Sequence, residues 1–176
     1  LPSEPRDWPR FPPDALPPDL LALSRLYPAL FDLPITHRDT TLRREARVVD
    51  VPAGTVLFEE RQPCRGFPFV LEGEVRVARG SAQGRSIELY RVGPGELCVV
   101  SASCLFGRSE LAAHGVATEP TRLMLLSPAG FDELSVDEPF RRFVFGVFAD
   151  RLADLMTLAE AVAFQRLDQR LANALL

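Results

Sequence analysis

The residues best suited to binding an anion lie between residues 93 and 109. A glycine-flanked loop, Gly93-Pro94-Gly95-Glu96-Leu97, comes first, and backbone amides in such a loop can face an anion. Arg108 and Ser109 lie later in the same stretch, and the planar fork of an arginine can pair with two oxygens of an anion. We therefore take this stretch as the candidate ligand site.

Thiols and one imidazole lie in or near the same stretch. The chain has three cysteines, Cys64, Cys98 and Cys104, but no signal peptide and no apolar run of about 18 residues. This pattern predicts reduced thiols in a cytoplasmic protein without a membrane segment, not a disulfide framework. A redox switch between Cys98 and Cys104 would require an exposed thiol of low pKa. The alternative is that both are buried as small apolar residues and that His114 ends a strand or faces solvent.

No motif of a known catalytic type is present. The chain has no Gly-x-x-x-x-Gly-Lys loop, no His-Glu-x-x-His and no Gly-x-Ser-x-Gly. Glu59-Glu60 and Asp132-Glu133 are adjacent carboxylates, but neighbouring side chains point in different directions and do not form an acid/base pair. We expect that the protein is not an enzyme.

The composition fits one domain with appendages. The 176 residues are 47% apolar, which is enough to bury a core. The net charge of −4 argues against a direct grip on nucleic acid, because binding phosphates needs a clustered basic surface.

The chain divides into three parts. Residues 1–18 contain prolines at a density that predicts an extended arm. Residues 19–136 begin with short helices, then change to a period of two with frequent turns, which predicts an antiparallel β sandwich or barrel. Residues 137–176 predict one long helix. The expected strands are 47–51, 55–58, 67–71, 74–78, 86–92, 112–118 and 121–126, followed by a short helix capped by Ser127.

The long helix carries an apolar seam. Phe148, Leu152, Leu155, Ala159 and Val162 alternate steps of four and three, the 3.5-residue period of a coiled coil. This spacing predicts a homodimer paired along these helices. The helix reaches the last residue without a stop signal, so we expect that the chain continues in the intact protein.

Three phrases and the long helix carry a resemblance to a known family. The phrases are Pro52-Ala53-Gly54-Thr55-Val56-Leu57-Phe58, Leu71-Glu72-Gly73-Glu74-Val75-Arg76-Val77 and Gly93-Pro94-Gly95-Glu96-Leu97. Over roughly residues 47–176 the chain resembles bacterial Crp/Fnr transcription regulators, which include the catabolite activator. The resemblance implies an α+β, mainly β fold: a cyclic-nucleotide-binding-like antiparallel β roll (jelly roll) with short N-terminal helices and a long C-terminal dimerisation helix. It also implies allosteric control of DNA binding through a C-terminal domain that these residues lack.

The residues that hold cyclic AMP in such relatives are altered here. Gly95, Glu96 and Leu97 match the start of the phosphate cassette, but the expected Arg-Ser pair falls on Glu110-Leu111 when counted back from the strand at 116–118. A carboxylate there would repel the phosphate. The Thr-Ser pair that meets the purine aligns with Leu155-Met156, beside Thr157. We therefore expect that the effector is not cyclic AMP and leave its identity open.

Several alternatives remain open on the sequence. Arg108-Ser109, two residues before Glu110, would make a genuine cyclic-nucleotide receptor if the loop length differs. Haem-bearing relatives that sense carbon monoxide or nitric oxide need an axial donor, for which Cys98, Cys104 and His114 are the candidates. An iron–sulfur cluster is disfavoured because it needs about four thiolates. A stand-alone interaction module without a small ligand is the last alternative.

Overall fold

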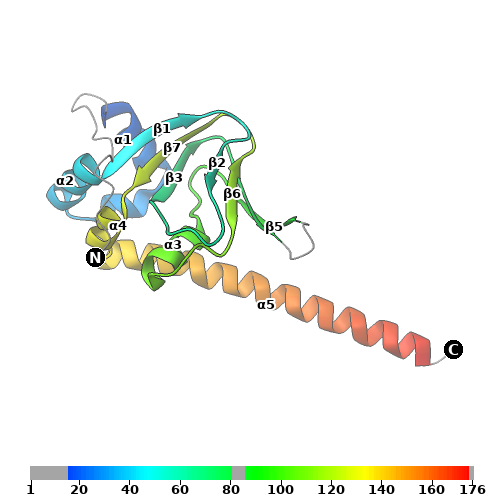
Figure 1. Ribbon diagram of the computed structural model, residues 1–176. Helices are drawn as coiled ribbons and strands as arrows, with labels where there is room; N and C mark the ends of the chain where they lie inside the picture. The colour runs from blue at the N-terminus through cyan, green and yellow to red at the C-terminus, as the bar shows by residue number, and fades with distance from the viewer. Residues whose placement is uncertain (1–15, 81–85, 175–176) are drawn as a thin grey trace.

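Two antiparallel sheets face each other at the centre of the protein (Figure 1). The computed structural model describes residues 16–80 and 86–174, and their side chains except those of residues 16–18, 35 and 162–174. One sheet has the order β1-β7-β3 and the other β2-β6-β4-β5. The strands are β1 (Ala46–Val51), β2 (Val56–Phe58), β3 (Phe67–Glu72), β4 (Val75–Gly80), β5 (Ser86–Val92), β6 (His114–Ala117) and β7 (Thr121–Leu126). The predicted β roll is confirmed.

Each face of the three-stranded sheet packs on a different layer. Side chains alternate between the two faces of a strand, so Phe67 and Phe69 of β3 point one way and Val70 the other. The two phenylalanines join the core beneath the helices, whereas Val70 packs with Val75 and Val77 of β4 between the sheets. As expected from their spacing, both β4 valines are buried.

Short helices cover the outer face of this sheet. They are α1 (Leu16–Leu26), the 3₁₀ helix η1 (Pro28–Asp32), α2 (Ile35–Glu45) and α4 (Pro128–Leu134). As expected, the Ser127 hydroxyl caps α4 by accepting a hydrogen bond from the Gly130 N–H, at 3.0 Å. Helix α1 begins at Leu16 and not at Asp19, because prolines fit the first turn, whose N–H groups have no partner within the helix. Residues 1–15 of the predicted arm lie outside the described residues.

Two helices were not predicted from the sequence. Helix α2 has little apolar periodicity, and Leu42 is its buried leucine. Helix α3 (Val99–Gly107) directly follows the glycine-flanked loop, and its N-cap residue Cys98 makes no side-chain capping bond. Without a start signal or a clear amphipathic pattern, neither helix could be told from a loop.

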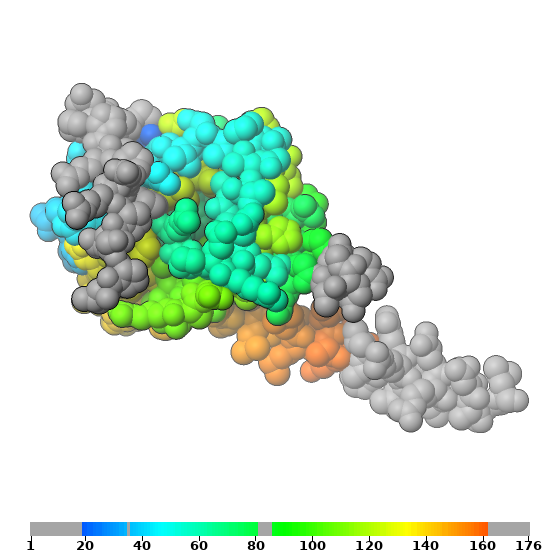
Figure 2. All heavy atoms as spheres, viewed as in Figure 1, coloured from blue at the N-terminus to red at the C-terminus, as the bar shows by residue number. Residues whose placement is uncertain are grey.

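Helix α5 (Glu138–Ala174) is the predicted long helix, and it spans 37 residues. Its first turns are part of the core, where Phe140 and Val144 are buried. Beyond them the helix runs straight past the roll and away from it, through Gly146 without a break (Figures 1 and 2). Within the described residues, the structure contains no helix with the length and apolar character needed to cross a membrane.

Candidate functional site

The glycine-flanked loop is held against the core by a buried tyrosine. Gly95 has φ +84°, a conformation that favours glycine, and Leu97 is buried and bridges to Phe69 of β3. The Tyr27 hydroxyl lies 2.9 Å from the Val70 carbonyl oxygen and 3.1 Å from that of Glu96, positioned to donate to either. The Glu96 carboxylate accepts from the Gly93 N–H at 2.8 Å, so it folds back on its own loop.

Removing the Tyr27 hydroxyl is expected to loosen this loop. We predict that Tyr27→Phe lowers the free energy of unfolding at neutral pH by about 1–3 kcal/mol, because buried carbonyls lose a donor. Burial raises the pKa of Tyr27 above its ordinary value. A phenol whose folded pKa is raised stabilises the fold below pH ~10, and this contribution is lost as the pH rises further.

Chemical denaturation at a series of pH values measures this effect. The wild type should lose stability more steeply than Tyr27→Phe above pH ~10. Parallel curves for the two proteins would contradict the burial of a neutral phenol at this position.

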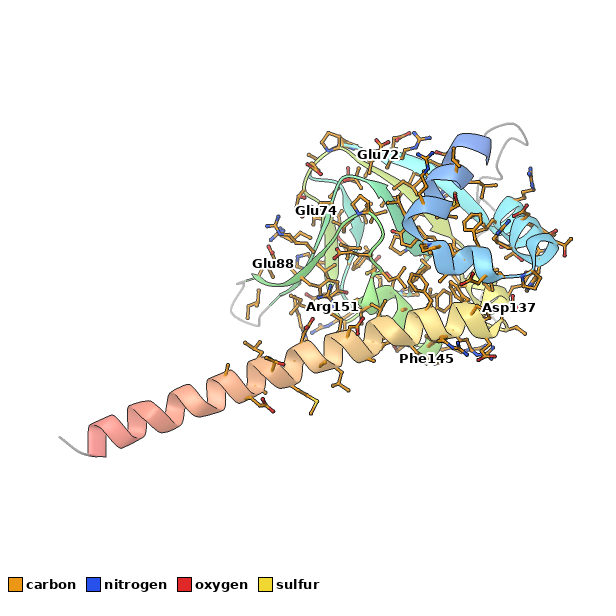
Figure 3. The ribbon with its side chains drawn as sticks, turned by 180° about the vertical axis from the view of Figure 1, so that it is seen from behind. Glu72, Glu74, Glu88, Asp137, Phe145 and Arg151 are labelled. Atoms are coloured by element: carbon orange, nitrogen blue, oxygen red, sulfur yellow. The ribbon has the colours of Figure 1, made fainter. Side chains whose placement is uncertain are left out.

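The hydroxyl of a second tyrosine, Tyr90, contacts the start of α3. The Tyr90 hydroxyl of β5 accepts a hydrogen bond from the Val100 N–H at 3.0 Å and lies 3.9 Å from the Cys98 Sγ. Burial raises the pKa of Tyr90, which keeps the phenol neutral. The Arg151 guanidinium of α5 lies 5.2 Å from the centre of the Tyr90 ring, and Figure 3 shows Arg151 on the side of the helix nearest the roll. Tyr90 therefore contacts both α3 and α5.

Arg108 lies at the other end of α3 from Gly95. It follows the last residue of the helix with φ 48°, and its side chain is 86% exposed, 4.0 Å from Asp132 of α4. Nine helical residues, about 13 Å of helix, separate it from the loop. Ser109 and Glu110 are also exposed, whereas Leu111 is buried. The structure therefore does not bring Arg108 together with Gly95, Glu96 and Leu97.

The candidates on α5 are exposed in the single chain. Leu155 and Met156 are 62% and 60% exposed, and the Thr157 hydroxyl bonds the Ala153 carbonyl of its own helix. They could contact a ligand only where another surface covers them.

The imidazole of His114 does not lie with the thiols of Cys98 and Cys104. Cys98 and Cys104 are both buried, as the structural alternative predicts, and their sulfurs contact Ser101 Oγ at 3.2 Å and the Ser109 carbonyl at 2.7 Å. His114 contacts Glu60 at 3.4 Å. His114 is the first residue of β6 and lies between the buried residues Ala113 and Gly115, so its side chain faces away from the inter-sheet layer that contains Cys98. This arrangement does not fit a shared haem site.

The environment of the thiols does not favour a redox switch. Burial raises the pKa of Cys98, and it raises the pKa of Cys64 to about 12, with Cys104 and Cys98 adding to the shift of Cys64. Reactive thiols need a low pKa and access to solvent. Within the part of the chain that the structure describes, no group of three or more His, Cys, Asp or Glu side chains is arranged to hold a metal ion.

Sequence reasoning missed the two tyrosines and Arg151. Tyr27 directly follows the first helix, and nothing in the sequence shows that its hydroxyl reaches a loop 69 residues away. Tyr90 lies in a predicted strand, but its contacts with α3 and α5 depend on how three separate elements pack.

The comparisons with known proteins agree on one family. The family model described as "Cyclic nucleotide-binding domain" matches residues 48–137. A Crp/Fnr-family transcriptional regulator from Eubacterium rectale is 25% identical, with a TM-score of 0.67 over 77% of this chain and 63% of its own. The Thermus thermophilus catabolite activator protein is 27% identical, with a TM-score of 0.56 over 76% of this chain and 60% of its own.

A third solved structure is matched over nearly its full length. The N-terminal domain of a transcriptional regulator from Streptomyces coelicolor is 28% identical, with a TM-score of 0.55 over 76% of this chain and 94% of its own. No curated protein sequence matches the chain.

Proposed function

This chain belongs to the cyclic nucleotide-binding domain family, and on that premise we propose that it senses an effector and dimerises to control DNA binding by a Crp/Fnr-type transcription regulator. Its solved structural neighbours include Crp/Fnr-family transcriptional regulators. The chain spans 63% of the length of the Eubacterium rectale regulator and 60% of that of the Thermus activator. In the proposal, a domain outside these 176 residues binds DNA.

The exposed apolar row on α5 carries the proposal of a homodimer. Leu152 and Leu155 are 59% and 62% exposed, and Ala159 is also exposed. These three are seam positions, and Val162 continues the seam at a residue whose side chain lies outside the described part. Phe148, at the other end, packs partly against the core. A row of apolar side chains with this spacing is stabilised when a second copy buries it.

The same helix supports the allosteric part of the proposal. Its first turns lie in the core, and Arg151 contacts Tyr90, which contacts the start of α3. A displacement of α3 would therefore alter, through Tyr90, the contacts of α5 next to the seam. In the proposal, the effector shifts the population between two arrangements of the paired helices and so re-aims the DNA-binding domains, without any enzymatic step.

We propose that the effector is not cyclic AMP. The Val100 N–H at the start of α3 already donates a hydrogen bond to the Tyr90 hydroxyl. The Arg108 side chain points to solvent beside Asp132. Glu110 adds a negative charge near the end of this stretch. A cyclic phosphate would therefore gain neither a free helix amide nor a guanidinium without rearrangement.

Two measurements test the proposed function. Sedimentation equilibrium at micromolar concentration should show a dimer, and a monomer would contradict the interpretation of α5. Isothermal titration with cyclic AMP should give no saturable heat in the micromolar range. Micromolar affinity, abolished by Arg108→Gln, would instead establish the cyclic-nucleotide receptor that Arg108 offers.

A further inference from the structure

A cavity lies beside the three-stranded sheet, away from the glycine-flanked loop. Its volume is about 360 Å³, within the range of small-molecule sites, roughly 300–1,000 Å³. Leu125 of β7 and Pro68 of β3, which pair in the sheet, contribute to the lining. Residues of β2 and of the 59–66 segment also line the cavity, and Ser101 and Leu111 complete it. The glycine-flanked loop contributes no residue, so the two sites are separate.

Two side chains of opposite charge line this cavity without an ionic partner. Glu59 and Arg65 both belong to the 59–66 segment and are exposed. The Glu59 carboxylate accepts a hydrogen bond from the Gln62 amide at 2.8 Å, but no cationic side chain in the described part of the chain pairs with it. Among the same residues, no carboxylate pairs with Arg65. Arg47 also lines the cavity but already has an interaction partner, so Glu59 and Arg65 are the charges open to a ligand.

The rest of the lining combines apolar side chains with polar groups that are already bonded. The apolar side chains include Leu57, Phe58, Pro68, Leu111 and Leu125. The Ser101 hydroxyl donates a hydrogen bond to the Cys98 Sγ at 3.2 Å, and the Cys64 thiol donates to the Gly66 carbonyl oxygen at 3.2 Å. Because both donors have partners within the protein, an aliphatic ligand group beside them leaves neither unsatisfied. This part of the cavity therefore suits an aliphatic group.

We propose that this cavity binds a free α-amino acid with an aliphatic side chain. The Glu59 carboxylate pairs with the ammonium of the ligand, the planar fork of Arg65 pairs with its carboxylate, and the leucines enclose its side chain. A zwitterion matches these two charges, whereas a simple anion or cation leaves one of them without a partner. This inference names the effector class of the sensor and rests on the proposed function in that respect.

Helix α3 connects the cavity to α5. Ser101 belongs to α3, and Leu111 follows the end of that helix. Helix α3 packs against α5, where the ring of Phe106 stacks on that of Phe145 with centroids 5.5 Å apart. A ligand in the cavity therefore contacts the same helix that packs on α5.

L-Leucine is the probe for the test, and three comparison compounds each change one of its features. The compound 4-methylpentanoate lacks the ammonium, 3-methylbutylamine lacks the carboxylate, and L-asparagine replaces the aliphatic side chain with a polar one of similar size. Isothermal titration of the whole chain should show saturable binding of L-leucine and at least fivefold weaker binding of each comparison compound. The expected factor is modest because Glu59 and Arg65 are exposed, so water screens their pairing with the ligand.

Substitutions at the two charges test the same pairing from the protein side. Glu59→Gln and Arg65→Gln should each weaken L-leucine binding at least fivefold. Glu59→Gln should leave the affinity for 4-methylpentanoate unchanged, because this compound has no ammonium to pair with Glu59. Arg61→Gln is the matched control, since Arg61 is exposed on the same segment but does not line the cavity, and it should bind L-leucine as the wild type does.

Three results would overturn the proposal. They are the absence of saturable L-leucine binding to the wild type, equal affinity for L-leucine and any comparison compound, and unchanged L-leucine affinity in folded Glu59→Gln or Arg65→Gln protein. Circular dichroism checks folding, and the comparison compounds on the wild type decide the matter if a variant is unfolded. If L-leucine binds through Glu59 and Arg65 but the chain is monomeric, the ligand site stands and the proposed regulator function fails. A dimer that does not bind L-leucine overturns the ligand site alone.

Discussion

Replacing Leu155 with aspartate is expected to convert the dimer into a monomer. Leu155 lies at the centre of the proposed seam and is 62% exposed in the single chain. Two copies paired along α5 would bury it, so the substitution removes apolar contact and places a carboxylate from each copy in the interface. We expect the dimer dissociation constant to rise at least about 100-fold, which corresponds to ~2.7 kcal/mol.

Sedimentation equilibrium measures the change, and Ala161→Asp is the matched control. Ala161 is exposed on the same helix but lies two residues after the seam position Ala159, on the outer face of a coiled coil. The control carries the same added charge and should remain dimeric. If Leu155→Asp sediments as the wild type does, α5 does not pair along this seam. If both variants are monomers, the added charge itself is responsible, and the seam assignment fails.

Phe131 is expected to contribute strongly to the stability of the core. It belongs to α4 and is fully buried, with ring centroids 5.0 Å from Phe67, 4.8 Å from Phe106 and 5.5 Å from Phe140. These contacts join α4 to the three-stranded sheet, α3 and α5. Phe131→Ala should lower the free energy of unfolding by about 3–5 kcal/mol, because a large cavity remains.

Phe145→Ala is the control for this experiment. Phe145 also contacts Phe106, but it is 54% exposed, so its removal should cost about 1 kcal/mol or less. Urea denaturation monitored by circular dichroism gives both values. Equal losses for the two variants would show that burial does not rank these rings, and would contradict the packing around α4.

Local sequence signals are sufficient to predict the β roll and the long helix. Glycines mark the turns that separate the strands, and Gly54, Gly73 and Gly95 all adopt φ +84° there. Val75 and Val77, two residues apart in β4, are both buried, as the period of two along a strand requires. The Ser127 cap and the long apolar period fixed α4 and α5. These features depend on neighbouring residues, so a single sequence contains them.

Helices α2 and α3 and the surroundings of the site depend on long-range packing and could not be predicted from local sequence. Helix α3 has no capping side chain, and α2 owes its place to contacts with α4, so local signals for both are weak. The direction of Arg108 follows from the left-handed turn after α3 and could not be counted from spacing. Hydrogen bonds connect Tyr27 to the glycine-flanked loop and Tyr90 to α3, and each joins segments distant in sequence. The same is true of the strand pairing of Leu125 with Arg47 and with Pro68. Such contacts depend on how the layers pack, because long-range packing sets which side chains meet.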